Sequence, residues 1–410
     1  MQSPPEPGSA REARALALRI APGVFLAGVG GGMAFPILPL VGLKAGLPLP
    51  FIGLILAANR IGRVAVSPLV GRAIDRFGPK RLLVLGLALN VVVFGCYWAG
   101  VVTGRPGGLF LIGRLLHGPG SACVFIGGQM LALHAGGERY RGLSSGIVRS
   151  AQSAGMPAGL VLGGLLAGWL GPAAAFAVAA LAPAAAVLVA ETGIPDLRAV
   201  SRQLPSLRAT LGLLADPSIA ALGWVSFASA FSAQGVVLTT LVLLVRDRHI
   251  ALGSLSAQTS SGLFMGIVVV CMVLASPAAG RLSDRPGWRA LLATGGLAAM
   301  IPGLLLIGLA HAPWSLGFGL SFVGLGMGAL AAPRLALIGD LAGPAWRGTA
   351  LGTLQLCGDI GGSLGPVVGA TLLGAGGLAP FAGSAALVAL ALPAGLFLRG
   401  AELRARAAAG

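Results

Sequence analysis

The chain reads GRAIDRFG over residues 71–78, and a related segment, GRLSDRPG, follows 209 positions later at 280–287. Both copies lie between two long apolar runs. A second repeat has an offset of 206, because glycines at 146, 155, 159 and 163 recur at 352, 361, 365 and 369. A whole helical unit is therefore duplicated, an arrangement typical of membrane transporters built from two related helix bundles.

The composition excludes a water-soluble domain. Of the 410 residues, 56% are hydrophobic and 10% are charged, which leaves too little polar surface for a folded chain of this length in water. Apolar stretches long enough to cross a bilayer are predicted at 20–43, 50–70, 81–103, 108–133, 143–167, 172–191, 218–245, 257–279, 289–310, 313–339, 349–373 and 378–398. All are expected to be helices, because an open strand edge leaves backbone groups unpaired in hydrocarbon. The predicted fold class is an all-α integral membrane protein with twelve transmembrane helices in two pseudo-symmetric six-helix bundles.

The repeats divide the chain into two halves joined by a polar segment. We expect a cytoplasmic tail at 1–19, a six-helix bundle at 20–191, a cytoplasmic linker at 192–216, a second bundle at 217–398 and a cytoplasmic tail at 399–410. Residues 1 to about 15 are rich in Pro, Glu and Arg, a composition that predicts disorder. The linker is expected to contain an amphipathic helical piece at the membrane surface.

Positive charge is distributed by side of the membrane. The net charge of +16 would suit nucleic acid, but twelve spans place 19 of the 28 Lys and Arg residues on the side of both termini. Only four lie on the other side, namely Lys44, Arg105, Arg246 and Arg248. The positive-inside rule makes the first side cytoplasmic. We therefore predict a multi-pass protein of the cell (inner or plasma) membrane with cytoplasmic termini and no nucleic acid partner.

Several stretches of the sequence carry a resemblance to a known family. GRAIDRFGPKR at 71–81, its copy GRLSDRPGWR at 280–289 and the twelve spans in two halves resemble the major facilitator superfamily. FPILPLV at 35–41, LIGRLLHGPG at 111–120 and the glycine series of the fifth span resemble its drug:proton antiporter branch. The resemblance covers essentially the whole chain and implies a secondary transporter that works by alternating access.

The repeated loop motif implies a cytoplasmic gate. In the family that it resembles, the residues matching Gly71, Asp75, Arg76 and Gly78 have this role, since the charges pair with the facing bundle when the cytoplasmic side is shut. The alternative is that the charges only set topology, but topology does not need the Asp that both copies keep. The expected gate consists of Gly71, Arg72, Asp75, Arg76, Gly78, Gly280, Arg281, Asp284, Arg285 and Asp340.

The acid that faces the motif differs between the halves. Asp340 lies seven residues before Arg347, and the equivalent position, seven before Arg141, is His134. His134 is a candidate pH-sensitive replacement, because imidazole titrates near neutrality. The alternative is a solvated residue at a helix end.

Ionisable side chains inside membrane spans are costly and usually face a cavity or a partner. Asp359 is the only carboxylate well inside a span, and Gln355 lies one turn away on the same face. Asp359 is therefore the first candidate for a proton site, with a structural salt bridge to Arg334 or Arg63 as the alternative. The resemblance implies a role in proton transfer for Arg114. The predicted substrate cavity is lined by Asn59, Arg63, Arg114, His117, Arg149, Gln152, Arg334 and Gln355.

Small residues form two further features. The glycine-rich faces at Gly159–Gly163 and Gly365–Gly369 suit close packing and sliding of helices between the bundles, or static packing alone. The four cysteines lie far apart in apolar spans without C-x-x-C spacing, so neither a disulfide framework nor a zinc site is indicated.

The charge of the predicted cavity bears on the substrate. Five embedded arginines against one aspartate favour neutral, zwitterionic or anionic amphipathic compounds over cations. We expect proton-coupled export of such small molecules. The alternatives are proton-coupled uptake of an organic anion or nutrient, a lipid or lipid-linked carrier, and a membrane receptor or assembly factor that transports nothing. The expected partners are the substrate, protons and the lipid bilayer, and the chain is expected to be a monomer without enzymatic activity, cofactor or metal.

Overall fold

The computed structural model describes residues 9–135, 140–194, 212–283, 285, 287–342 and 347–407. Within these ranges every regular element is helical. Twelve helical spans are long and apolar enough to cross a membrane, and each corresponds to one span predicted from the sequence. The predicted fold class is therefore confirmed.

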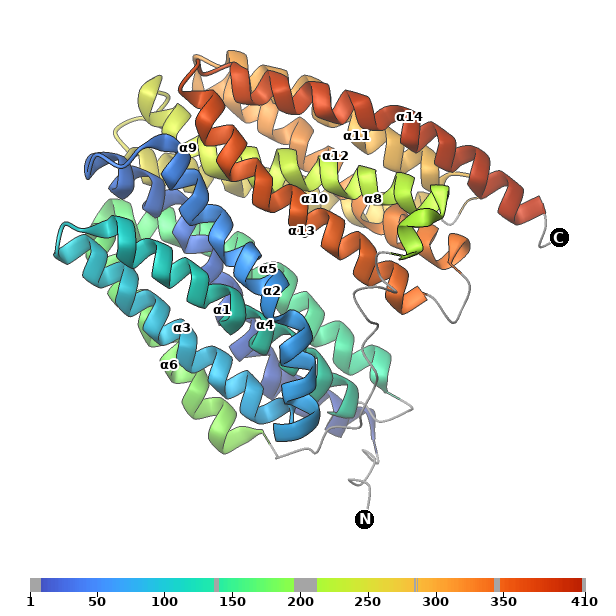
Figure 1. Cartoon of the computed structure of the whole chain (residues 1–410), viewed down its shortest axis with the longest axis horizontal. Coiled ribbons are helices and arrows are strands. Elements are labelled where there is room, and N and C mark those ends of the chain that lie inside the picture. The colour runs from blue at the N-terminus through green and yellow to red at the C-terminus, as the bar shows by residue number, and fades with distance from the viewer. Residues whose placement is uncertain are drawn as a thin grey trace. The chain divides into compact units, whose positions relative to one another are not determined.

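The first six spans are single helices (Figure 1). They are α1 (Ala10–Lys44), α2 (Leu49–Phe77), α3 (Pro79–Val102), α4 (Pro106–Ala135), α5 (Arg141–Leu170) and α6 (Pro172–Gly193). Pro79 and Pro172 each occupy the first position of a helix, where the missing N–H of proline costs nothing. The chain therefore enters α3 and α6 directly after a one-residue turn, at Gly78 and Gly171.

The seventh span consists of three continuous elements. These are α8 (Pro217–Ser229), the π-helical η2 (Ala230–Val237) and α9 (Leu238–Asp247). The short 3-10 helix η1 (Leu213–Ala215) precedes them, and the later spans are α10 (Ala257–Ser283), α11 (Arg289–Leu309), α12 (Pro313–Leu341), α13 (Arg347–Leu373) and α14 (Ala379–Ala407). Asp216 starts the seventh span as an N-cap, since its carboxylate accepts hydrogen bonds from the N–H groups of Ser218 and Ile219 at 2.8 and 3.2 Å.

The chain divides into two compact units. The N-terminal unit comprises Met1–Leu47 and Ala58–Leu204, and the C-terminal unit comprises Pro48–Ala57 and Pro205–Gly410. The first turns of α2 thus belong to the C-terminal unit, an assignment that the repeat spacing does not indicate. The linker expected at 192–216 lies outside the described residues over 195–211, so its amphipathic helix stays a prediction.

Both expected tails are partly helical. α1 starts at Ala10, and the Ser9 side chain accepts a hydrogen bond from the Glu12 N–H at 3.3 Å. Ala13, on the next turn, is fully buried. The prediction of disorder through about residue 15 is wrong from Ala10 onward, because a capped first turn and small apolar residues let the helix continue and pack. α14 likewise continues past the expected end at 398 to Ala407.

Glycines allow two helices to meet closely in each unit. A Cβ on Gly159 of α5 would lie 1.9 Å from the Val29 carbonyl oxygen of α1, and one on Gly365 of α13 would lie 2.5 Å from the Phe231 carbonyl oxygen of η2. No side chain fits at such distances, so the backbone approach requires glycine. Of the two alternatives, static packing agrees with these contacts, because the nearest neighbours of both glycines lie in their own unit.

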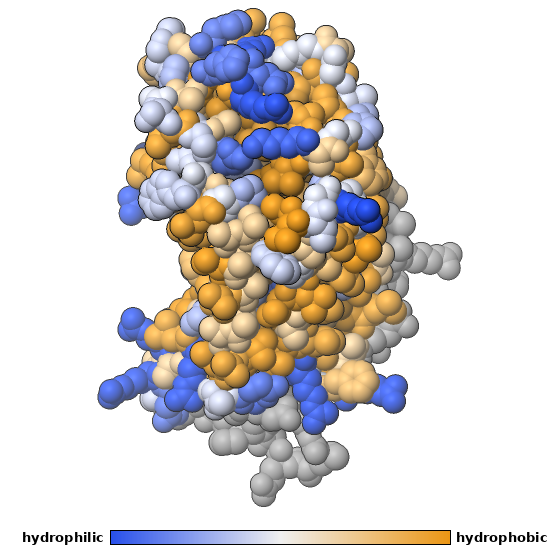
Figure 2. Space-filling view, turned by 90° about the vertical axis from the view of Figure 1, so that its left-hand side faces the viewer, coloured by the Kyte–Doolittle hydropathy of each residue, from blue (hydrophilic) through white to orange (hydrophobic). Residues whose placement is uncertain are grey.

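Figure 2 shows one face of the molecule, where a band of hydrophobic residues is bounded at both ends by hydrophilic ones. Large apolar side chains are exposed on several helices, with exposed fractions of 68% for Leu188 of α6, 69% for Leu274 of α10 and 71% for Trp314 of α12. Soluble proteins rarely expose so many large apolar side chains. Such a band is expected of a protein whose solvent is the bilayer.

Candidate functional site

Asp359 lies in the middle of α13, away from both ends of the helix. Gln355, one turn earlier, donates a hydrogen bond from Nε2 to Asp359 Oδ1 at 3.3 Å. Asp359 is 9% exposed, whereas Gln355 is exposed. The structure thus brings together the two side chains whose i, i+4 spacing places them on one face, with the carboxylate inside the unit and the amide at its surface.

Arg334 on α12 faces α8. Its Nη1 donates a hydrogen bond to the Ser226 hydroxyl at 3.5 Å, and that hydroxyl donates to the Leu222 carbonyl oxygen at 2.9 Å. Ser226 is fully buried. Sequence reasoning missed this polar partner on the seventh span, because only the packing of α12 on α8 brings the two residues together.

Arg114 and His117 on α4 lie inside the N-terminal unit. Arg114 is fully buried, and its guanidinium carbon is 5.2 Å from the centre of the Phe35 ring on α1, which suits a cation–π interaction. The guanidinium also interacts with the Tyr97 hydroxyl on α3. His117 is 3% exposed and meets α1 at Gly31, where a Cβ would lie 3.1 Å from Nε2. These two residues therefore contact α1 and α3 rather than an exposed surface.

The predicted cavity residues on α5 are more exposed than Arg114 and His117 on α4. Arg149 is exposed and Gln152 is half-buried, and Ser150 and Ser153 are exposed on the same side of the helix. Polar side chains in a membrane span avoid hydrocarbon, because lipid tails offer no hydrogen-bond partner. This α5 polar stripe (Arg149, Ser150 and Ser153) is therefore suited to line an aqueous path. Sequence reasoning missed the two serines, although their spacing from Arg149 was a readable signal.

Asn59 and Arg63 lie one turn apart on α2, and both are half-buried. Between them, Gly62 packs against α4, since a Cβ there would lie 2.8 Å from the Leu115 carbonyl oxygen. Arg63 lies beside the turn of α4 that carries His117, since a Cβ on Gly118 would lie 2.6 Å from the Arg63 main-chain nitrogen. α2 thus brings a positively charged residue close to the buried residues of α4.

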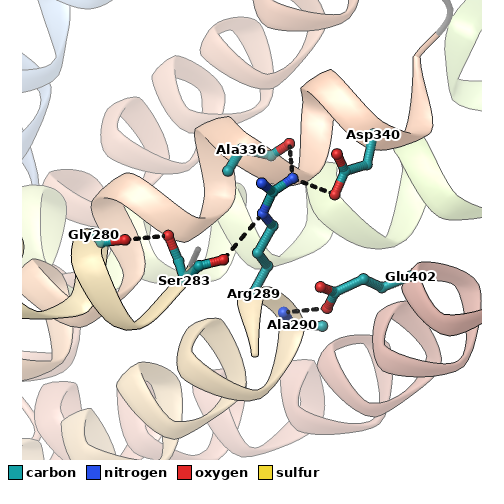
Figure 3. Close-up of polar contacts among 7 residues, drawn as sticks. All are labelled: Gly280, Ser283, Arg289, Ala290, Ala336, Asp340 and Glu402. Atoms are coloured by element: carbon teal, nitrogen blue, oxygen red, sulfur yellow. Dashed lines mark hydrogen bonds and ion pairs between the residues drawn. The ribbon is translucent and has the colours of Figure 1, made fainter. Parts of the chain in front are cut away.

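Where α10 meets α11, Asp340 takes part in an ion pair (Figure 3). Its carboxylate pairs with Arg289 Nη1 at the start of α11. The same guanidinium donates from Nε to the Ser283 carbonyl oxygen at 3.2 Å and from Nη1 to the Ala336 carbonyl oxygen at 3.5 Å. One arginine therefore ties α10, α11 and α12 together. The expected gate includes Asp340 but not Arg289. Arg289 follows Lys80 by 209 positions, the offset of the repeated motif, and this spacing could have identified it.

Each unit also has an acid near the end of its last helix. Lys80 Nζ lies 3.8 Å from Glu191 Oε2 on α6 and donates to the main-chain oxygen of Glu191 at 2.8 Å. Glu402 on α14 is fully buried, and its Oε2 accepts a hydrogen bond from the Ala290 N–H at 2.9 Å (Figure 3). Glu402 thus caps the start of α11, where the helix dipole favours a carboxylate, whereas Glu191 contacts the start of α3 only through the Lys80 side chain. Sequence reasoning missed both.

The repeated motif is only partly described. Gly78 and Gly287 have φ angles of 88° and 74°, which only glycine adopts without strain. Gly71 and Gly280 lie within α2 and α10, and the exposed arginines of the motif are Arg76, Arg281 and Arg285. Asp284 and the side chains of Arg72 and Asp75 lie outside the described part of the structure, so their gating role stays a prediction.

His134 makes a local contact, with Nδ1 2.7 Å from the Met130 carbonyl oxygen one turn earlier. All four cysteines are free. Among the described residues, no three His, Cys, Asp or Glu side chains gather in a way that would hold a metal ion.

Comparison with known proteins identifies the family. The sequence profile of the Major Facilitator Superfamily matches residues 20–366 and, in a second match, residues 251–408. The chain belongs to the Major Facilitator Superfamily. It is therefore a multi-pass membrane transporter.

Relatives include efflux pumps. The chain is 25% identical over 371 residues to the multi-drug resistance efflux pump PmrA homolog of Lactococcus lactis, covering 86% of each chain. It is 27% identical over 371 residues to PmrA of Streptococcus pneumoniae, covering 86% of this chain and 88% of the relative.

Solved structures share the fold. The human organic anion transporter MFSD10 (TETRAN) aligns with a TM-score of 0.64 at 23% identity, over 94% of this chain and 99% of that one. The nucleoside transporter NupG aligns with a TM-score of 0.72 at 14% identity, over 95% and 99% of the two chains.

Proposed function

We propose that this transporter exports small amphipathic organic compounds in exchange for protons, by alternating access. The proposal rests on the position of Asp359, whose carboxylate lies in the middle of α13 and accepts a hydrogen bond from Gln355. Every other Asp or Glu in the part of the chain that the structure describes lies at or near the end of a helix. A proton carrier must exchange its proton from within the membrane, and Asp359 has that position.

The pair of Asp359 and Gln355 gives the coupling a physical route. When ionised, the carboxylate accepts the hydrogen bond from the Gln355 amide; when protonated, it becomes a donor itself. Gln355 is exposed and Asp359 is buried, so a substrate meets the amide first. A protonated Asp359 can donate to the Gln355 amide oxygen. A substrate donor that binds this oxygen competes with the protonated carboxyl, so substrate and proton exclude each other, as exchange requires.

The proposed substrates are neutral, zwitterionic or anionic. The α5 polar stripe presents the Arg149 guanidinium with two serine hydroxyls, a set of donors suited to a carboxylate or sulfonate group. Two relatives named above are efflux pumps, and the MFSD10 structure is that of an organic anion transporter. These similarities support export as the direction and an organic anion as one substrate class.

A second candidate is uptake of an organic anion by proton symport. The exposed guanidinium of Arg149 favours an anion equally in this case. The two candidates differ in the sign of coupling, since symport moves substrate and proton in the same direction and exchange moves them in opposite directions.

Purified protein in proteoliposomes tests both, with the anionic dye fluorescein as the probe. For the exchanger, an acidic lumen should drive fluorescein accumulation. Asp359→Asn should abolish this accumulation while dye counterflow without a pH gradient persists, because the amide keeps the size and hydrogen bonding of the side chain but cannot carry the proton. Asp247→Asn, at an exposed carboxylate at the end of α9, is the matched control and should behave as the parent.

Two results would change the assignment. Accumulation driven only by an alkaline lumen would establish symport. Full pH-driven accumulation by Asp359→Asn would remove this residue from the proton path.

A further inference from the structure

A buried polar core lies within the N-terminal unit, apart from the α5 polar stripe. It consists of Asn90 and Tyr97 on α3 and Arg114 and His117 on α4, none of which is more than 3% exposed. Phe35 of α1 covers the guanidinium. We call these four residues the α3–α4 polar core.

Two members of this core have unfilled hydrogen-bonding capacity. Among the described residues, neither Asn90 Nδ2 nor Asn90 Oδ1 has a hydrogen-bond partner, and His117 Nδ1 also has none. A buried polar atom without a partner costs about 1–3 kcal/mol. In folded proteins such atoms are normally satisfied by other groups, by ordered water or by an ion. These atoms can therefore form hydrogen bonds with a bound water, ion or ligand group.

Glycines let α1 and α4 approach the polar atoms of the core closely. Asn90 lies against Gly120 of α4, where a Cβ would come within 3.4 Å of Asn90 Oδ1. On the other side, a Cβ on Gly31 of α1 would come within 3.1 Å of His117 Nε2. Gly120 and His117 are one turn apart on α4, so the amide and the imidazole approach the same part of the unit from α3 and α4.

The charges around the core select the kind of occupant. Arg114 is a permanent cation, and Arg63 of α2 adds a second positive charge beside α4, since a Cβ on Gly118 would lie 2.6 Å from the Arg63 main-chain nitrogen. The sequence has no Asp or Glu between Glu12 and Asp75, or between Asp75 and Glu138. An occupant thus meets a positive field in a medium of low dielectric constant, which favours an anion over water.

We propose that the α3–α4 polar core binds an anionic group. Asn90 Nδ2 donates to it, the charges of Arg114 and Arg63 hold it, and a ring N–H of His117 can donate to it. The group is either a free halide or the carboxylate or sulfonate head of a transported compound. If the group is the head of a transported compound, the inference rests on the proposed function. If it is a free halide, the anion is a resident ion that balances positive charge in the N-terminal unit.

Thermal unfolding of the purified protein in detergent tests the proposal, with sodium chloride and sodium benzoate as separate probes. The reference sample contains sodium fluoride at the same ionic strength. Fluoride is a suitable reference because it is strongly hydrated and resists entry into a buried site. Binding of one anion at saturation should raise the Tm of the parent by about 2–4 °C. Asn90→Leu should lose this rise, since leucine keeps the volume of the side chain but has no donor.

Gln129→Leu is the matched control. Gln129 Oε1 is another buried amide oxygen on α4 without a hydrogen-bond partner in the described structure, but it lies about 18 Å along the helix from His117. This variant should keep the full anion-dependent rise. If Asn90→Leu does not fold, His117→Gln provides a second loss-of-binding variant with a polar side chain.

The two probes separate the sources. A rise with chloride supports the resident ion, and a rise with benzoate alone supports the substrate head group. No rise with either probe, or an equal rise in Asn90→Leu and the parent, would overturn the proposal. Either of these results leaves the Asp359 assignment intact, because the latter depends on pH-driven transport and not on anion binding.

Discussion

At the scale of single residues, exposure separates two kinds of embedded cation. Arg149 is exposed on α5, whereas Arg114 is fully buried against Phe35. The sequence assigns both to one cavity, because it shows that a residue lies in a span but not which neighbours cover it. A soluble substrate reaches the exposed guanidinium first, so Arg149 is the better candidate for charge selection.

Arg149→Ala should therefore weaken binding of anionic probes more than neutral ones. A hydrogen bond to a charged group contributes about 1.5–3 kcal/mol, so the Kd for fluorescein should rise roughly tenfold or more. An uncharged dye should lose less than about twofold. Fluorescence titration of the purified variant measures both, with Arg246→Ala, an exposed arginine at the end of α9, as the control. Equal losses for both dyes would indicate a structural role.

The acids of the two repeats offer a second test at this scale. Glu402 is fully buried and accepts from the Ala290 N–H, whereas the Glu191 side chain is 57% exposed. Glu402→Leu should lower the free energy of unfolding by about 1–3 kcal/mol, because the helix N-terminus loses its acceptor. Glu191→Leu should cost less than about 1 kcal/mol, as is usual for exposed ion pairs. Thermal unfolding in detergent compares them, and equal losses would contradict this account.

At the scale of elements, hydropathy predicts where the helices are but not where they end. The twelve spans follow from apolar length alone, since a bilayer imposes its thickness on the sequence. The helical turns of α1 before residue 20 depend on the Ser9 cap and on the burial of Ala13, which only the folded unit shows. The π-helical turns of η2 lie where Gly365 of α13 meets the Phe231 carbonyl oxygen. The hydropathy of the seventh span does not indicate this local change in helix type.

The glycine contacts predict unequal effects of one substitution at two positions of α5. Gly159→Ala should destabilise the protein by about 1–3 kcal/mol, because the new methyl group would overlap the Val29 carbonyl oxygen of α1. Gly146→Ala should be neutral or stabilise by up to about 1 kcal/mol, since a Cβ there meets nothing within 4 Å and alanine favours the helix. Denaturation of both variants in the same detergent checks this. Equal stability would show that α1 and α5 separate easily.

At the scale of the whole molecule, the two repeats build similar parts with different contacts. Both motif turns need a glycine with positive φ, at Gly78 and Gly287, and the repeat predicts that equivalence. Arg289 pairs with Asp340, whereas Lys80 pairs with Glu191. Spacing alone cannot predict this difference, because each pairing depends on which helix end packs nearby. The sequence thus predicts the architecture and the repeated positions, and the structure assigns their partners.

The distribution of charge over the molecule makes a prediction about its orientation. With 19 Lys and Arg residues on the side of both termini and four on the other, the termini should lie in the cytoplasm. Green fluorescent protein fused after residue 410 should be fluorescent, and alkaline phosphatase at the same position should be inactive, because its disulfides do not form in the cytoplasm. A phosphatase fusion after Gly104, in the turn between α3 and α4, is the matched control and should be active. The reverse pattern would place Arg289 and Asp340 on the outer side, and the ion pair could then not belong to a cytoplasmic gate.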